Sequence, residues 1–269
     1  MEAVQEGLAI TTTSRTSQTE GPAGTLHIDD GGTGGTPVVF LHSFGGSTAH
    51  WLPQLEHLRR TRRAIAFDLR GHGASAAPVD GDYAVESQAA DLGAVLDGLA
   101  LANVVLVGHG LGATVAIEFA GTVPKRVDGL LIAAAPARIS AEQAAQMQAA
   151  LEADYDKTSE QINARLLTGA SDEVRAIVIR DARAVPRDAG LQIIRASFEY
   201  DPVPALQRYA GPKLAVTSPD ATTPNDLHNL AGGITHEIMS GTSHWMELDK
   251  PDEFNRIVDR FLERIGGST

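Results

Sequence analysis

Two polar residues near the end of the chain have the types and positions of an acid–base pair. Asp220 follows the short run Lys213–Thr217, and His244 follows the short run Ile234–Ile238. If both runs are strands, both side chains stand at carboxyl ends of strands, where open α/β sheets bind ligands. An aspartate can hold an imidazole in one tautomer and stabilise the imidazolium, while the imidazole accepts a proton from a reacting group.

A third segment, VGHGLGA at Val107–Ala113, has the form of a turn that could present a reacting group to this pair. It lies between an expected strand, Val104–Val107, and an expected helix, Thr114–Gly121, which is the context of a nucleophile elbow, G-x-S-x-G. The outer glycines suit a sharp turn in which side chains would clash with neighbouring backbone. The middle position is Gly110, which has no Oγ, so no acyl-enzyme can form there.

Two further loops contain glycine and polar residues directly after short apolar runs. In Leu41–Ser47, LHSFGGS, the glycines let backbone amides approach a ligand closely. In Phe67–Ser75, FDLRGHGAS, we expect Arg70 and His72 to fix the loop by hydrogen bonding. A direct functional role for those two side chains is the alternative.

The elements that must position these residues follow an alternating pattern. Short apolar runs typical of strands buried on both faces alternate with amphipathic segments of helical spacing, which predicts a doubly wound, mostly parallel α/β sheet. Residues 14–24 are rich in Ser, Thr and Gly and are expected to form a loop or a loose hairpin connection. The expected strands are Leu26–Asp30, Val38–Leu41, Ala64–Phe67, Val104–Val107, Leu130–Ala134, Lys213–Thr217 and Ile234–Ile238. The expected helices within the sheet region are Gln88–Leu99, Thr114–Gly121 and Phe254–Ile265.

The alternation is interrupted once, over residues 137–206, where the sequence is rich in Ala, Gln and Glu and has no strand run. A helical insertion between strands of one sheet predicts a cap over the carboxyl edge of that sheet. We therefore expect a core made of residues 25–136 and 207–269, a helical cap at 137–206, and an N-terminal extension, partly mobile, at 1–24.

These segments, in this order, resemble those of the α/β-hydrolase superfamily over roughly Leu26–Leu262. LHSFGGS resembles its oxyanion loop, FDLRGHGAS the following strand and turn, VGHGLGA the elbow, TSPDATTP the acid loop, and GTSHWMELDKPDEF the histidine loop and final helix. The nearest resemblance is to capped, non-secreted esterases, lactonases and C–C-bond hydrolases. It implies hydrolysis of a small carboxylic ester or lactone through an acyl-enzyme, with no metal and no organic cofactor.

The resemblance also implies a role for each matching residue. A serine at the elbow would attack a carbonyl carbon, His244 would take its proton, and Asp220 would orient His244. The backbone N–H groups of Phe44 and Leu111 would hold the oxyanion. Four further residues are expected to bind substrate: His42, Ser43, His109 and Trp245.

Two residues depart from the family's pattern, because Gly110 replaces its serine and Ser43 stands where many relatives have glycine. We expect a nearly inactive chain, since loss of a triad serine costs on the order of 10⁶ in turnover. The explanation we favour is a deliberate serine-to-glycine change that keeps a substrate or product intact. The alternatives are a natural ligand-binding protein without catalysis, and an enzyme in which His244 and Asp220 activate water or abstract a substrate proton. Ser43 would be a displaced nucleophile only if its Oγ reached His244 Nε2, at about 2.6–3.2 Å.

Composition limits the partners. The 269 residues suit one large domain, and the net charge of −12 disfavours nucleic acid. The absence of cysteine excludes disulfides, a thiolate nucleophile and cysteine-ligated zinc. No run approaches the ~20 apolar residues of a membrane span, and the first residues lack the apolar core of a secretory signal. We therefore expect a cytoplasmic protein whose partner is a small-molecule ester or lactone.

Overall fold

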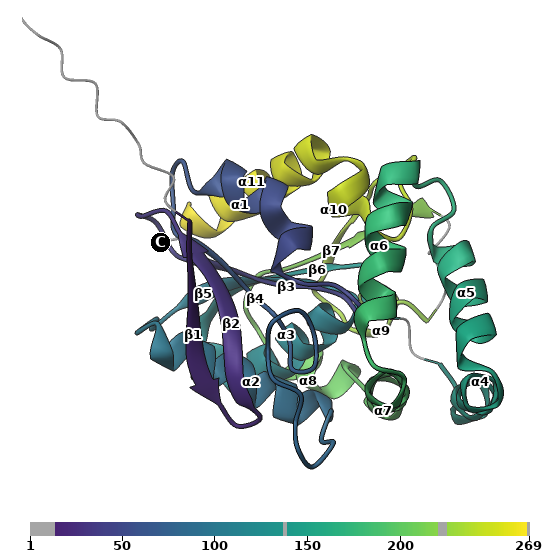
Figure 1. Cartoon of the computed structure of the whole chain (residues 1–269). Helices are drawn as coiled ribbons and strands as arrows, with labels where there is room; N and C mark the ends of the chain where they lie inside the picture. Colours follow the sequence, from purple (N-terminus) through teal and green to yellow (C-terminus); the bar gives the residue numbers. More distant parts are fainter. Residues whose placement is uncertain (1–13, 137–138, 220–224, 268–269) are drawn as a thin grey trace, which may run out of the picture.

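The structure, a computed structural model, describes residues 14–136, 139–219 and 225–267 and contains, over these residues, one sheet of eight strands (Figure 1). The strand order is β1-β2-β4-β3-β5-β6-β7-β8; β2 pairs antiparallel with both β1 and β4, and the remaining neighbours pair parallel. The predicted doubly wound, mostly parallel sheet is confirmed. The strands are β1 Ser14–Gly21, β2 Gly24–Gly31, β3 Val38–Leu41, β4 Ala64–Phe67, β5 Val104–His109, β6 Val127–Ala133, β7 Lys213–Thr217 and β8 Thr235–Ile238.

Helices cover both faces of the sheet, with α1 and α11 on one side and α2, α3 and α8 on the other (Figure 1). In β3, Val38 and Phe40 pack into the first layer while Val39 and Leu41 pack into the second, because successive strand residues point to opposite faces. No helix among the described residues is long and apolar enough to cross a membrane. The helices are α1 Leu52–Leu58, α2 Val85–Gly98, α3 Leu111–Thr122, α4 Ala141–Ala153, α5 Tyr155–Leu166, α6 Asp172–Ala184, α7 Arg187–Glu199, α8 Val203–Arg208, α9 Leu227–Leu230, α10 Met246–Asp249 and α11 Pro251–Gly266, with 3₁₀ turns η1 Thr48–Trp51 and η2 Pro124–Arg126.

Residues 14–24, expected to form a loop or a loose hairpin connection, instead contain the regular strand β1, which forms a hairpin with β2. Strand β1 pairs with β2 along its whole length, from Ser14 opposite Gly31 to Gly21 opposite Gly24. Its side chains are largely exposed, so it has no buried face and no hydrophobic alternation for sequence reasoning to detect.

Helices α4–α7 fill most of the segment predicted to be helical between β6 and β7, and α5 and α6 lie against loops at the carboxyl edge of the sheet (Figure 1). Gly45, in the loop after β3, has a φ of +72°, and a Cβ there would lie 2.7 Å from the Cα of Ala182 in α6. His50 Nε2 and the carboxylate of Asp181 in α6 are 3.0 Å apart. These contacts join α6 to the loop after β3 and to η1.

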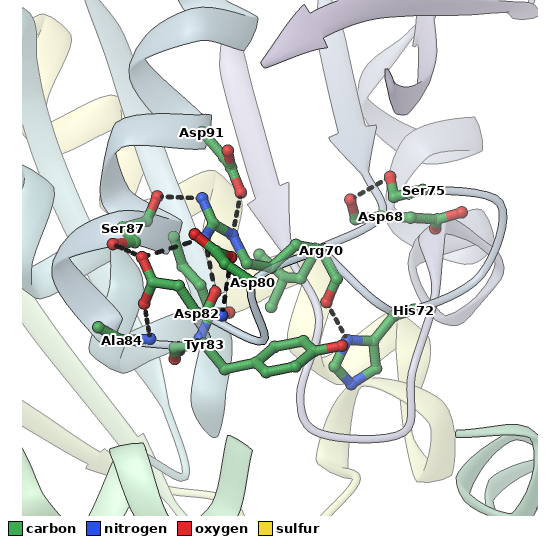
Figure 2. A network of polar contacts seen from close by, with 12 residues as sticks. Asp68, Arg70, His72, Ser75, Asp80, Asp82, Tyr83, Ala84, Ser87 and Asp91 are labelled. Carbon is green, nitrogen blue, oxygen red and sulfur yellow. Dashed lines mark hydrogen bonds and ion pairs between the residues drawn. The ribbon is translucent and has the colours of Figure 1, made fainter. Parts of the chain in front are cut away.

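A buried guanidinium joins the turn after β4 to the start of α2 (Figure 2). Arg70, 2% exposed, donates from Nε to Asp91 Oδ2 at 2.6 Å and from its two terminal nitrogens to the carbonyls of Asp82 and Ser87, both at 2.7 Å. The hydrogen-bonding role expected for Arg70 is confirmed. Because Asp91 is 1% exposed, removing Arg70 would leave its carboxylate buried without a cation.

We therefore expect Arg70→Met to lower the free energy of unfolding by about 3–5 kcal/mol, the usual cost of breaking a buried pair. Urea unfolding monitored by circular dichroism measures the change. The matched control is Arg126→Met, since Arg126 pairs with Asp97, whose side chain is 72% exposed. That change should cost about 1 kcal/mol or less, and equal losses in the two variants would contradict the role of burial.

Candidate active site

The turn between β5 and α3 has the backbone of a nucleophile elbow. Gly110 has φ +54° and ψ −115°, a conformation that costs a residue with a side chain of order 1–3 kcal/mol. A Cβ on Gly112 would lie 2.3 Å from the carbonyl oxygen of Leu41, and one on Gly108 would lie 2.5 Å from the carbonyl oxygen of Gly112. The close backbone packing expected around this turn is therefore confirmed.

Two backbone amides next to the elbow are available to a ligand. Over the described part of the chain, the N–H groups of Phe44 and Leu111 have no hydrogen-bond acceptor. Leu111 is the first residue of α3, where amides point out of the helix and carry its partial positive charge. The N–H of Gly112 donates to the carbonyl of His42 at 3.1 Å, which ties the loop after β3 to the elbow. Two free donors in this position can bind an oxyanion.

His244 lies in the loop after β8, where its N–H donates to the carbonyl of Leu166 at the end of α5, at 3.0 Å. Its side chain is partly exposed. Burial lowers the pKa of the imidazole well below 6.5, and the nearby His109 and Arg165 lower the pKa further. The ring is therefore neutral at neutral pH, the form that a general base requires.

Ser43 occupies the space next to the elbow. A Cβ built on Gly110 would lie 2.1 Å from Ser43 Oγ, 3.0 Å from Ser43 Cβ and 3.6 Å from His244 Nε2. The sheet explains this convergence: Leu41 of β3 pairs with Gly108 of β5, so Ser43 and Gly110 each follow the same rung by two residues. The hydroxyl of Ser43 thus fills the volume that a side chain at position 110 would use, beside His244.

A family model described as the alpha/beta hydrolase family matches residues 38–257. The chain belongs to the alpha/beta hydrolase family. It is 27% identical to 3-oxoadipate enol-lactonase 2 of Acinetobacter baylyi over 238 residues, which are 85% of this chain and 89% of that protein.

Another relative matches a shorter stretch. The dihydrolipoyllysine-residue acetyltransferase component of an acetoin cleaving system, from Pseudomonas putida, is 44% identical over 107 residues, or 39% of this chain and 28% of that protein. Among solved structures, a thermophilic esterase from Thermogutta terrifontis superposes with a TM-score of 0.81 at 22% identity, covering 93% of this chain and 99% of the esterase. At that identity the esterase supports the fold alone.

The acid predicted for this hydrolase, Asp220, lies outside the described residues. Strand β7, which ends at Thr217, pairs with β6 and β8 in parallel. The chain therefore leaves β7 at the same edge of the sheet as the elbow and the His244 loop. The role of Asp220 stays a prediction.

The imidazole of His42 supports the loop after β3. Its side chain is 1% exposed, Nδ1 lies 2.7 Å from the carbonyl oxygen of Ser43, and Nε2 lies 2.9 Å from the amide nitrogen of Leu69. These partners fit a neutral ring with the proton on Nδ1, and burial lowers the pKa of His42 well below 6.5. Both nitrogens are used within the protein, so substrate binding by His42 stays a prediction.

The rings of His109 and Trp245, also predicted to bind substrate, both pack against the ring of His244. His109 Nδ1 is 2.8 Å from Glu247 Oε1, and both side chains are at most 1% exposed. The ring centroids of His109 and His244 are 4.7 Å apart. Trp245 packs against Leu167 and other apolar residues of the α5–α6 region. Sequence reasoning missed Glu247, although a carboxylate three residues after the candidate histidine was a visible signal.

His72, in the turn after β4, gives the fold a measurable pH dependence. It is 2% exposed, and burial lowers its pKa to about 4 although the Arg70 carbonyl opposes this. Below pH 6.5, His72 binds a proton in the unfolded chain, whereas in the folded chain it binds one only near pH 4. The free energy of unfolding therefore falls as the pH drops through this window.

For His72 alone, the loss between pH 7 and pH 5 amounts to about 2 kcal/mol. We expect His72→Gln to reduce the pH dependence of the free energy of unfolding by that amount. Urea unfolding at the two pH values measures it. His57→Gln is the control, since His57 is 34% exposed, and an unchanged slope for His72→Gln would contradict this assignment.

Proposed function

We propose that the chain hydrolyses small carboxylic esters or lactones at this site, without a hydroxyl at the elbow itself. One observation carries the proposal: the backbone of Gly110 directs a side chain to a point 3.6 Å from His244 Nε2, beside the free amide of Leu111. This is the geometry in which a base and an oxyanion hole serve one carbonyl group. The likeness to an enol-lactonase over most of both chains supports the substrate class.

In this proposal the substrate's carbonyl oxygen accepts hydrogen bonds from the N–H groups of Phe44 and Leu111. His244, oriented by Asp220, accepts the proton of whichever hydroxyl attacks the carbonyl carbon, from water or from a side chain near the elbow. It then returns that proton to the leaving group. Gly110 supplies no nucleophile, so turnover by the elbow route is lost, at a cost on the order of 10⁶. A deliberate replacement of serine and a natural glycine at position 110 would both give this outcome.

The test is a hydrolysis assay of the chain and its His244→Ala variant against p-nitrophenyl esters of two to eight carbons and against five- and six-membered lactones. We expect slow hydrolysis of some of these compounds that disappears in His244→Ala. His57→Ala is the matched control, because His57 lies on α1 and pairs with Asp259 of α11. Rates that are equal in the chain and His244→Ala, on every compound, would contradict the proposal, and ester binding without turnover would favour a ligand-binding protein.

A further inference from the structure

We propose that the hydroxyl of Ser43 is the nucleophile of this chain, so that the acyl-enzyme forms on the loop after β3 instead of on the elbow. This inference rests on the proposed function and names the atom that attacks the ester. It also explains both differences from the family's pattern: serine at position 43, where many relatives have glycine, and glycine at position 110, where the family has serine. The hydroxyl lies on the loop after β3 instead of on the elbow.

The space at the elbow admits one hydroxyl. The 2.1 Å between Ser43 Oγ and the Cβ position of residue 110 is closer than two non-bonded atoms can approach. Ser43 Cβ is also within 3.0 Å of that position. Glycine at position 110 therefore makes the room that the side chain of Ser43 occupies, and Ser43 replaces the group that the elbow lacks.

Ser43 is held in this position by its surroundings. Its carbonyl oxygen accepts hydrogen bonds from the N–H of Gly46, at 3.0 Å, and from the Nδ1 of His42, at 2.7 Å. Its side chain is 5% exposed, so its position is set by packing. A nucleophile needs such support, because small displacements from the productive geometry cost much of the rate.

His244 Nε2 lies near Ser43 Oγ, without a hydrogen bond between the two in the described part of the chain. Ser43 Oγ and His244 Nε2 both lie within 3.6 Å of the same point, the Cβ position of residue 110. Proton transfer needs an approach of about 2.6–3.2 Å, which catalytic pairs commonly reach only with substrate bound. Because burial lowers the pKa of His244, its imidazole is neutral at neutral pH and can accept a proton.

The two candidate oxyanion donors also suit a nucleophile at Ser43. At an elbow the first donor is the amide of the residue after the nucleophile. For Ser43 that residue is Phe44, whose N–H has no acceptor among the described residues. The amide of Leu111, at the N-terminus of α3, supplies the second donor.

Hydrolysis at Ser43 takes place in two stages, acylation and deacylation. Ser43 Oγ forms a bond to the carbonyl carbon and passes its proton to His244, while the carbonyl electron pair moves to the oxygen. The oxyanion collapses, the bond to the alcohol breaks, and the alcohol oxygen takes the proton from His244. Water then passes a proton to His244 and attacks the acyl carbon on Ser43. The bond from that carbon to Ser43 Oγ breaks, Oγ takes the proton from His244, and the carboxylic acid leaves.

Adduct mapping tests the proposal. The full-length chain is incubated with an alkyl fluorophosphonate, and the modified residue is located by intact mass and fragment spectra. We expect one phosphonyl group on Ser43, none in Ser43→Ala, and a slower reaction in His244→Ala. Ser17→Ala, which removes an exposed hydroxyl of β1, is the matched control and should leave the labelling unchanged.

The rate of ester hydrolysis should depend on the same residue that carries the phosphonyl group. We expect Ser43→Ala to lower the His244-dependent rate of ester hydrolysis at least about 100-fold. Hydrolysis that depends on His244 but neither on Ser43 nor on an adduct there would overturn this inference and leave the proposed function standing. No His244-dependent hydrolysis of any ester or lactone, with no adduct, would overturn both.

A second variant tests the pairing without relying on turnover. The chain has no cysteine, so Ser43→Cys introduces a single thiol whose alkylation by iodoacetamide can be followed against pH. If position 43 faces His244, the thiol ionises at a lower pH in Ser43→Cys than in the double variant Ser43→Cys/His244→Ala, since a neighbouring histidine stabilises the thiolate. Identical pH profiles for the two variants would contradict the pairing.

Discussion

Replacing both Ser43 by glycine and Gly110 by serine is expected to raise kcat/KM for activated esters by about 10³-fold or more over the unchanged chain. The double variant places the hydroxyl on the elbow, directly before the first amide of α3, where it is best oriented for attack. It also leaves room for the new side chain, because the atoms 2.1 Å and 3.0 Å from its Cβ position belong to Ser43.

Gly110→Ser alone should gain much less, since its Cβ collides with Ser43 Oγ unless that side chain rotates away. Ser43→Gly alone should be the slowest of the four proteins, because it contains neither hydroxyl. A double-mutant cycle on kcat/KM measures the coupling between the two positions. A simple deliberate replacement at position 110 predicts instead that Gly110→Ser equals the double variant, and no gain in either variant would contradict acyl transfer at this site.

The gain in rate is expected to come with a loss in stability. A side chain at φ +54° costs of order 1–3 kcal/mol, so the double variant should unfold at lower urea concentration than the chain. Activity and stability should therefore change in opposite directions at position 110. Urea unfolding of the same four proteins shows whether this is so.

Removing His244 from the double variant should lower kcat by about 10⁶-fold, the loss found when a triad histidine that acts as base is removed. The pH dependence of the rate tests independently whether His244 acts as the base. Hydrolysis needs the neutral imidazole, and burial lowers the pKa of His244 well below 6.5. The rate should therefore stay level from pH 8 to below pH 6.5 and fall only as the pH drops through the lowered pKa.

The charged and titratable groups around His244 explain this expectation. His109 packs against the ring of His244 and lies beside Glu247, and Arg165 comes from α5; both His109 and Arg165 lower the pKa of His244. Measuring kcat/KM from pH 4 to 9 locates the midpoint. A midpoint at or above pH 7 would mean that a carboxylate, such as Asp220, outweighs burial and the effects of His109 and Arg165.

The fold could be predicted where strands are buried on both faces. The predicted bounds of three strands agree with the structure at every residue, because each strand is a short, mainly apolar run next to polar or turn residues. They are Val38–Leu41, Ala64–Phe67 and Lys213–Thr217. Strand β1 was missed because its Ser, Thr and Gln side chains are largely exposed and show no apolar period.

The site could be predicted in its parts but not in its assembly. The elbow motif identified Gly110, and the loop after β8 identified His244. The contact between Ser43 and the elbow depends on β3 and β5 being neighbours with Leu41 opposite Gly108, although the two strands are not consecutive in sequence. That pairing is a property of the sheet order, which the apolar runs alone do not specify.

The most direct test of the account is a crystal structure of the chain after reaction with an alkyl fluorophosphonate. We predict continuous density from Ser43 Oγ to the phosphorus atom, with the phosphoryl oxygen hydrogen-bonded to the amides of Phe44 and Leu111 and with His244 Nε2 beside Ser43 Oγ. An unmodified Ser43, or a phosphonyl group held elsewhere with both amides unused, would contradict a hydrolase site built from Ser43, the elbow and His244.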